Sequence, residues 1–232
     1  MCLATTLVGP TDGTVPPIVA TTGWANDRSV WMPMAEDLAV SHRLATWDLR
    51  GHGASGTPLP GNYTRDHALG DLATVCDHAR DGATSGPVVL MGHSFGGFLS
   101  LAQAIHRPDD VAALVLVAAG PGFRKAEARN QWNESVRASA AKMDQPPGVE
   151  EISMHHDSFV IDHLADIRCP VLVLLGERDK RFAASASLFE RELDVRASVV
   201  VPDQGHMVHL KAAGTCAAEV RRFLTGVFPT VT

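Results

Sequence analysis

The sequence predicts an α/β fold built on a mostly parallel, doubly wound sheet. Short apolar runs alternate with amphipathic segments along most of the chain. Two of the runs, residues 111–118 and 171–175, are almost continuously apolar, which is typical of parallel strands covered on both faces. A third run, at 88–91, passes through a glycine-rich turn into a helical segment at 95–105. This alternation implies right-handed crossovers between parallel strands.

The segments before the turn follow the same rhythm. Residues 3–8, 17–22 and 43–47 are predicted as strands. Helices are expected at 30–40 and 64–80, because apolar residues recur there at helical spacing. Three strands and two helices are therefore expected before the glycine-rich turn.

An interruption follows the apolar run that ends at residue 118. Residues 120–164 carry many charges, a proline pair and a second helical pattern around 152–164, so we expect an inserted lid of two or three helices. The sheet and its own helices are then formed by residues 1–119 and 165–232.

The last part of the chain returns to alternating elements. A helix is expected at 182–193, a strand at 198–201, and a terminal helix at 208–228 that is broken near Gly214 or begins after it.

The turn itself has the sequence Gly92-His93-Ser94-Phe95-Gly96, a G-x-S-x-G pattern. A strand-to-helix turn this tight needs flanking residues that are nearly free of side chains, and it lifts the serine hydroxyl above the end of the strand. The amino end of the following helix points its unpaired N–H groups and its positive dipole at the same place. One turn would thus supply a nucleophile and an anion-stabilising pole.

Three further motifs, together with this turn, resemble those of the α/β-hydrolase superfamily. The resemblance extends over nearly the whole chain. Residues 48–55 (DLRGHGAS) match its D-x-R-G-x-G-x-S loop, residues 176–179 (GERD) its G-x-x-D segment, and residues 205–206 its G-H turn. The resemblance implies the α/β-hydrolase fold and a catalytic triad of Ser94, Asp179 and His206, in the chain order of that fold. It also implies that the outermost amino-terminal strand is missing, since only about 16 residues precede the second predicted strand. His52, inside the first motif, is expected to have a structural role.

Two features near the triad leave questions open. Glu177 and Asp203 are other carboxylates that could serve His206, although the family pattern favours Asp179. The resemblance assigns the oxyanion hole to the backbone N–H groups of Trp24 and Phe95, but the family's His-Gly pair before this loop is Thr22-Gly23 here. Because the donor is a backbone group, the change need not remove it.

Substrate contacts are expected from the lid and from the loops beside the triad. The candidates are Trp24 and Met207 beside the triad and, in the lid, Trp132, Met143, Met154 and Phe159. Each of the four lid residues could instead serve only lid packing.

The composition limits the classes of partner that the protein could bind. A net charge of −6 without a basic cluster argues against nucleic acid, and no apolar stretch approaches the roughly 20 residues of a membrane span. Four scattered cysteines and no visible secretory signal favour a cytoplasmic protein with reduced thiols. No cofactor is implied. Adjacent His155, His156 and Asp157 would diverge on a helix, so no metal site is predicted there. The chain could be a monomer or a homodimer.

Together these features predict a serine esterase or lactonase acting on a small, mostly apolar molecule, similar to the family's carboxylesterases, enol-lactonases and haloperoxidases. A carbon-carbon bond hydrolase or a perhydrolase would need the same triad. A ligand-binding receptor-like protein and a biosynthetic cyclase or lyase on the same fold are further alternatives.

Overall fold

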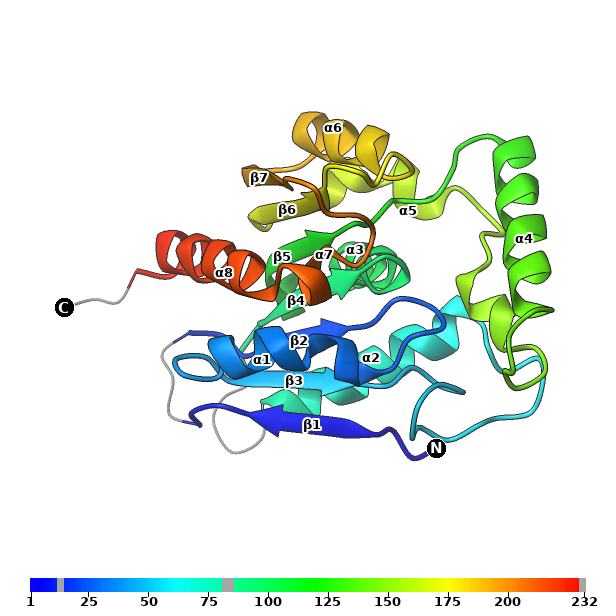
Figure 1. The fold of residues 1–232 in the computed structure, drawn as a ribbon, viewed down its shortest axis with the longest axis horizontal. Coiled ribbons are helices and arrows are strands. Elements are labelled where there is room, and N and C mark those ends of the chain that lie inside the picture. The colour runs from blue at the N-terminus through cyan, green and yellow to red at the C-terminus, as the bar shows by residue number, and fades with distance from the viewer. Residues whose placement is uncertain (12–14, 81–85, 230–232) are drawn as a thin grey trace.

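A single sheet of seven strands organises the residues that the computed structural model describes, 1–11, 15–80 and 86–229 (Figure 1). Its strand order is β1-β3-β2-β4-β5-β6-β7, with β1 antiparallel to β3 and every other pair parallel. The predicted fold class is confirmed. The strands are β1 (Thr5–Val8), β2 (Ile18–Thr21), β3 (Leu44–Trp47), β4 (Val88–His93), β5 (Val111–Val117), β6 (Val171–Gly176) and β7 (Val195–Val201).

Helices cover both faces of the sheet, and each face has its own core. One core packs against α2 (Arg65–Ala79), α3 (Phe95–His106) and α6 (Ala183–Glu192), and the other against α1 (Met32–Leu38) and α8 (Ala213–Val227). Strand β4 shows the division within one run, because Leu90 belongs to the first core and its neighbours Val89 and Met91 to the second. Burial on both faces therefore explains why the central strands are continuously apolar.

Residues 120–164 depart from the sheet. They hold α4 (Ala126–Ala140), the 3₁₀ helix η3 (Val149–Ser153) and the short α5 (Phe159–Asp162), followed by the 3₁₀ helix η4 (Leu164–Asp166). Figure 1 shows α4 beyond the carboxyl ends of the parallel strands.

The second lid helix, expected around 152–164, is limited to the short α5; the residues before it are irregular. The backbone is extended at Met154, where η3 ends. Asp157 then accepts a hydrogen bond from Phe159 N and forms an ion pair with Arg65 on α2. These contacts hold the segment in an irregular conformation. The helical spacing of its apolar residues does not indicate such contacts.

Three other elements differ from expectation in their boundaries. The helix expected at 30–40 is a 3₁₀ turn, η1 (Arg28–Trp31), followed by α1, which has Pro33 in its first turn. Strand β7 begins at Val195, three residues early, because alternate residues of an edge strand are exposed and break the apolar run. The terminal helix is broken as predicted, because Ala212 separates α7 (Val208–Lys211) from α8. A short 3₁₀ turn, η2 (Pro108–Asp110), precedes β5.

In the part of the chain that the structure describes, no helix has the length and apolarity needed to cross a membrane.

Candidate active site

Ser94 occupies a strained turn between β4 and α3. Its φ of 53° and ψ of −114° are unusual for a residue with a side chain. The glycines on either side are required by close packing: a Cβ on Gly92 would lie 2.3 Å from the carbonyl oxygen of Gly96, and one on Gly96 would lie 2.2 Å from that of Thr21. Ser94 N donates a hydrogen bond to Val117 O of the neighbouring strand (2.9 Å). The serine is thus fixed at the carboxyl edge of the sheet.

Asp179 and His206 are joined at the same edge. Nδ1 of His206 lies 2.7 Å from Oδ2 of Asp179. The carboxylate is buried, whereas the imidazole side chain is 40% exposed. Their two loops are locked together, because Arg178 N donates to Gln204 O (2.7 Å) and a Cβ on Gly176 would lie 2.4 Å from Gly205 O. The ring therefore turns Nε2 away from the carboxylate.

The two competing carboxylates are occupied elsewhere. Glu177 Oε2 accepts a hydrogen bond from Asp203 N (3.0 Å), and Asp203 forms an ion pair with Arg178 (2.5 Å). Only Asp179, of these three, is bonded to His206.

The imidazole of His206 lies between two other rings. Phe182 stacks on it, with centroids 5.1 Å apart and planes 15° apart, and His93 lies 4.6 Å away behind it. His93 Nε2 donates to the carbonyl oxygen of His206 (3.0 Å), which places the His93 proton on Nε2. No hydrogen bond joins Ser94 to His206 within the described residues; in such sites this contact often tightens only when substrate binds.

His93 also stacks on His209 (4.2 Å), which in turn stacks on Trp31 (4.4 Å). Burial, followed by the effect of the neighbouring histidines, holds the pKa of His93 well below its usual value and lowers that of His209 to about 3. Both rings are therefore neutral at ordinary pH, and they support His206 from behind without adding charge.

The loop after β2 passes beside the serine turn, which places Trp24 near Ser94. A Cβ on Gly23 would lie 3.2 Å from the Cβ of Ser94 and 2.9 Å from Nδ1 of His93, so this loop passes directly beside the turn. The backbone N–H of Trp24 follows it, and that of Phe95 begins α3. Neither N–H donates a hydrogen bond among the residues described. Thr22, which stands in place of the family's histidine, is fully buried.

His52 supports this loop from below. Its Nε2 accepts a hydrogen bond from Ala25 N (3.1 Å), so Nδ1 carries the proton that it donates to Arg50 O (3.0 Å). Burial lowers the pKa of His52, which favours this neutral form. Arg50 is itself held by a two-point ion pair with Asp71 (2.7 and 2.8 Å). The role of His52 in the geometry is to hold the backbone next to Trp24.

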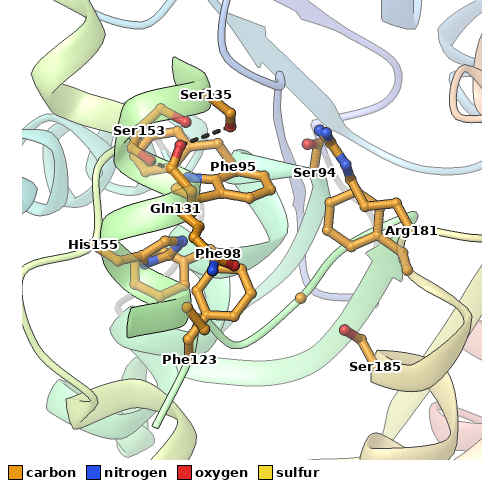
Figure 2. A pocket seen from close by; sticks show the side chains of 15 residues that line it. Ser94, Phe95, Phe98, Phe123, Gln131, Ser135, Ser153, His155, Arg181 and Ser185 are labelled. Carbon is orange, nitrogen blue, oxygen red and sulfur yellow. Dashed lines mark hydrogen bonds between the residues drawn. The ribbon is translucent and has the colours of Figure 1, made fainter. Parts of the chain in front are cut away.

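A cavity of about 370 Å³ opens beside Ser94, between the sheet edge and α4. Figure 2 shows Ser94 and Arg181 on one side of it and Phe123 and His155 on the other. Its lining residues are Ser94, Phe95, Phe98, Gly120, Gly122, Phe123, Ala128, Gln131, Trp132, Ser135, Ser153, His155, Arg181, Phe182 and Ser185. A second cavity of similar volume, lined by residues such as Pro170 and Phe223, contains none of the predicted site residues.

A family model described as the alpha/beta hydrolase fold matches residues 16–148, more than half of the sequence. The chain belongs to the alpha/beta hydrolase fold family. A thermophilic esterase from Thermogutta terrifontis superposes with a TM-score of 0.81 at 26% identity, covering 97% of this chain and 94% of that one.

Two curated relatives are also hydrolases. The (E)-2-((N-methylformamido)methylene)succinate hydrolase of Acinetobacter baylyi is 23% identical over 84% of this chain and 85% of its own length. The 2-hydroxymuconate semialdehyde hydrolase of a Pseudomonas species is 31% identical over 76% of this chain and 59% of its own. The family and these relatives support hydrolase activity for the alpha/beta hydrolase described here.

The predicted substrate contacts are dispersed in this alpha/beta hydrolase. Trp132 lines the cavity beside Ser94. Met143 is exposed, and Met154 lines a separate, smaller cavity of about 160 Å³. Phe159 is stacked between His106 (4.9 Å) and His163 (4.4 Å), outside the lining, as are the side chains of Trp24 and Met207.

Sequence reasoning missed most of the aromatic lining. Phe98 lies four residues after Ser94, and Arg181 and Phe182 lie two and three residues after Asp179. Their spacing from these two triad residues could have indicated them. Phe123 and His155 carry no such signal, because the fold of the lid brings them in.

The histidine pair in the lid does not converge on a metal. His155 lines the cavity, with its pKa lowered to about 4 by burial and then by the charge of Arg65, whereas Asp157 pairs with Arg65. Within the described ranges, no group of three or more histidine, cysteine or acidic side chains is arranged to hold a metal ion.

Proposed function

We propose that the protein is a serine hydrolase that cleaves the carboxylic ester or lactone of a small molecule through an acyl-enzyme on Ser94. The observation that carries this proposal is the 2.7 Å contact between Asp179 and His206 at the sheet edge where the strained Ser94 turn opens into a cavity. Five aromatic rings in the lining, those of Phe95, Phe98, Phe123, Trp132 and Phe182, suit a substrate with an apolar body.

In this mechanism His206 is the general base. Its Nδ1 is engaged by Asp179, so Nε2 is the nitrogen free to take the Ser94 proton as the hydroxyl attacks the carbonyl carbon. The buried carboxylate stabilises the imidazolium that forms. The backbone N–H groups of Trp24 and Phe95 receive the developing oxyanion, and each such donor typically contributes about 2.7 to 4 kcal/mol to lowering the barrier.

The proton taken from Ser94 leaves with the first product, and a proton from water later restores the serine hydroxyl. The imidazolium gives the Ser94 proton to the leaving alkoxide, which departs and leaves the acyl group on Ser94. His206 next takes a proton from water, whose oxygen attacks the acyl carbon. Collapse of that intermediate releases the acid and returns the proton to the serine oxygen.

A carbon-carbon bond hydrolase is the second candidate. Its support is the 31% identity to the 2-hydroxymuconate semialdehyde hydrolase over 76% of this chain. The triad would be the same, so substrate turnover must separate the two.

The test is hydrolysis of short-chain 4-nitrophenyl esters by the wild-type protein and by Ser94→Ala. We expect turnover by the wild type and a loss of at least about 10³-fold in kcat in the variant. Turnover that survives in Ser94→Ala would contradict the assignment. Inactivity on esters and lactones, with cleavage of a vinylogous diketone, would favour the carbon-carbon hydrolase.

A further inference from the structure

The cavity beside Ser94 has an unbalanced charge. Its lining contains one permanently charged side chain, Arg181, and no carboxylate. His155 adds no charge at neutral pH, since burial lowers its pKa to about 4. The other polar lining groups are uncharged: the Gln131 amide and several serine hydroxyls. An anion entering this cavity would therefore meet a cation and hydrogen-bond donors, with no like charge on the wall.

Arg181 is an exposed side chain that lines the cavity, and its contacts differ from those of Arg65, Arg124 and Arg129 near the lid. Arg65 pairs with Asp157, Arg124 with Asp162, and Arg129 donates to the carbonyl oxygens of residues 123 and 124. Arg178, three positions earlier than Arg181, pairs with Asp203. Among the described residues, no acidic side chain lies within ion-pair distance of Arg181.

The position of the Arg181 guanidinium is nevertheless defined. Its central carbon lies 5.2 Å from the ring centroid of Trp132, a cation–π contact across the cavity. A cation–π contact occupies no carboxylate or carbonyl acceptor, so the N–H groups of Arg181 stay available for a planar anion. In Figure 2 this group lies on the Ser94 side of the cavity.

We infer that Arg181 binds a carboxylate of the substrate, so that the preferred substrate is the half-ester, or the lactone with a free carboxylate, of a small dicarboxylic acid. This inference rests on the proposed hydrolase function and adds to it the class of substrate. The cavity volume of about 370 Å³ is near the lower end of the range for small-molecule sites and suits a small acyl group. The aromatic rings would contact the carbon chain, and Arg181 would fix which end of the molecule faces Ser94.

The test compares monomethyl glutarate with its neutral isostere, in which an amide replaces the free carboxylate. Turnover of each is followed in the wild type, Arg181→Gln and Arg181→Lys. Lys180→Gln removes the adjacent exposed cation, which does not line the cavity, and is the matched control. Dissociation constants of the two intact esters are measured separately in the Ser94→Ala background, with and without Arg181→Gln, where no chemistry is needed.

We expect the wild type to prefer the anion in kcat/KM by about tenfold or more, because a charge-assisted hydrogen bond contributes more than a neutral one. Arg181→Gln should abolish that preference, Arg181→Lys should keep part of it, and Lys180→Gln should leave it unchanged. The same preference should appear in the dissociation constants.

Equal binding of anion and amide with and without Arg181 would overturn the inference, while turnover of 4-nitrophenyl esters would still uphold the hydrolase. The reverse result, a preference for the anion that depends on Arg181 in a protein that hydrolyses no ester, would uphold carboxylate binding by Arg181 and refute the hydrolase.

Discussion

The sheet edge that carries the proposed triad and the cavity beside α4 are held together by different kinds of contact. At the edge, Ser94, Asp179 and His206 lie on loops held by backbone hydrogen bonds and by glycine contacts that leave no room for a side chain. Around the cavity, the lid is held mainly by side chains, such as Trp132 Nε1 bonded to Ser153 O (2.9 Å) and Asn133 bonded to the backbone of His155. We therefore expect the sheet edge to determine the chemistry and the lid to determine which substrate binds.

Mutations at the sheet edge and in the lid are expected to change different kinetic constants. A change at the edge alters groups that act in the transition state, so it should lower kcat. A change in the lid alters contacts that the substrate makes before and during reaction, so it should mainly raise KM.

The largest effect is expected from Asp179→Asn. An amide can hold the imidazole in the wrong tautomer and cannot stabilise the imidazolium, so kcat should fall roughly 10³- to 10⁴-fold with little change in KM. Steady-state kinetics on a 4-nitrophenyl ester measure this. Glu177→Gln is the control, because Glu177 bonds to Asp203 N and has no contact with His206; it should stay within about twofold of the wild type.

The difference between the sheet edge and the lid also explains which features of the structure could be predicted from the sequence. The Ser94 turn needs glycines at 92 and 96 for steric reasons, and the order of strands and helices follows from apolar runs buried on both faces, so local sequence is sufficient for both. The contact of Asp179 with His206 joins loops 27 residues apart, and only the resemblance to a family pointed to it.

The lid was harder to predict because its conformation depends on pairs far apart in the chain. The ion pair between Arg65 and Asp157 spans 92 residues, and it shapes the segment that was expected to be helical. Their place in the lid made Phe159 and Met154 candidates for substrate contact, yet Phe159 packs between two histidines and Met154 lines a different cavity.

A smaller effect is expected from Trp132→Ala in the lid. The change removes a ring from the cavity and the partner of Arg181, so KM should rise by about tenfold while kcat stays within a few fold. Phe159→Ala removes a lid aromatic of similar size that lies outside the cavity lining, and it should lower stability without raising KM. If the two variants had the same effect on KM, the assignment of the cavity would be wrong.

The smallest effect on activity is expected from His209→Phe, which instead tests the ring stack behind His206. The pKa of His209 is about 3 in the folded protein and near 6.5 when the ring is exposed, so the unfolded chain takes up the proton first as the pH falls. The histidine therefore lowers the free energy of unfolding as the pH drops below about 6.5.

Replacing His209 by phenylalanine keeps the ring and removes this titration. Between pH 7 and pH 5 the variant should lose about 2 kcal/mol less stability than the wild type, measured by denaturant unfolding at each pH. His78→Gln, which changes an exposed histidine on α2, should leave the pH dependence as it is. An unchanged slope in His209→Phe would mean that the ring is hydrated or charged in the folded state.

The most direct test of an activated Ser94 is mass spectrometry after exposure to a serine-directed fluorophosphonate. We expect one adduct, located on Ser94, that forms in the wild-type protein, is absent from Ser94→Ala and forms far more slowly in Asp179→Asn. A folded protein that gains no adduct, or gains it on another residue, would contradict an activated Ser94, and a ligand-binding role for the cavity would then explain the site better.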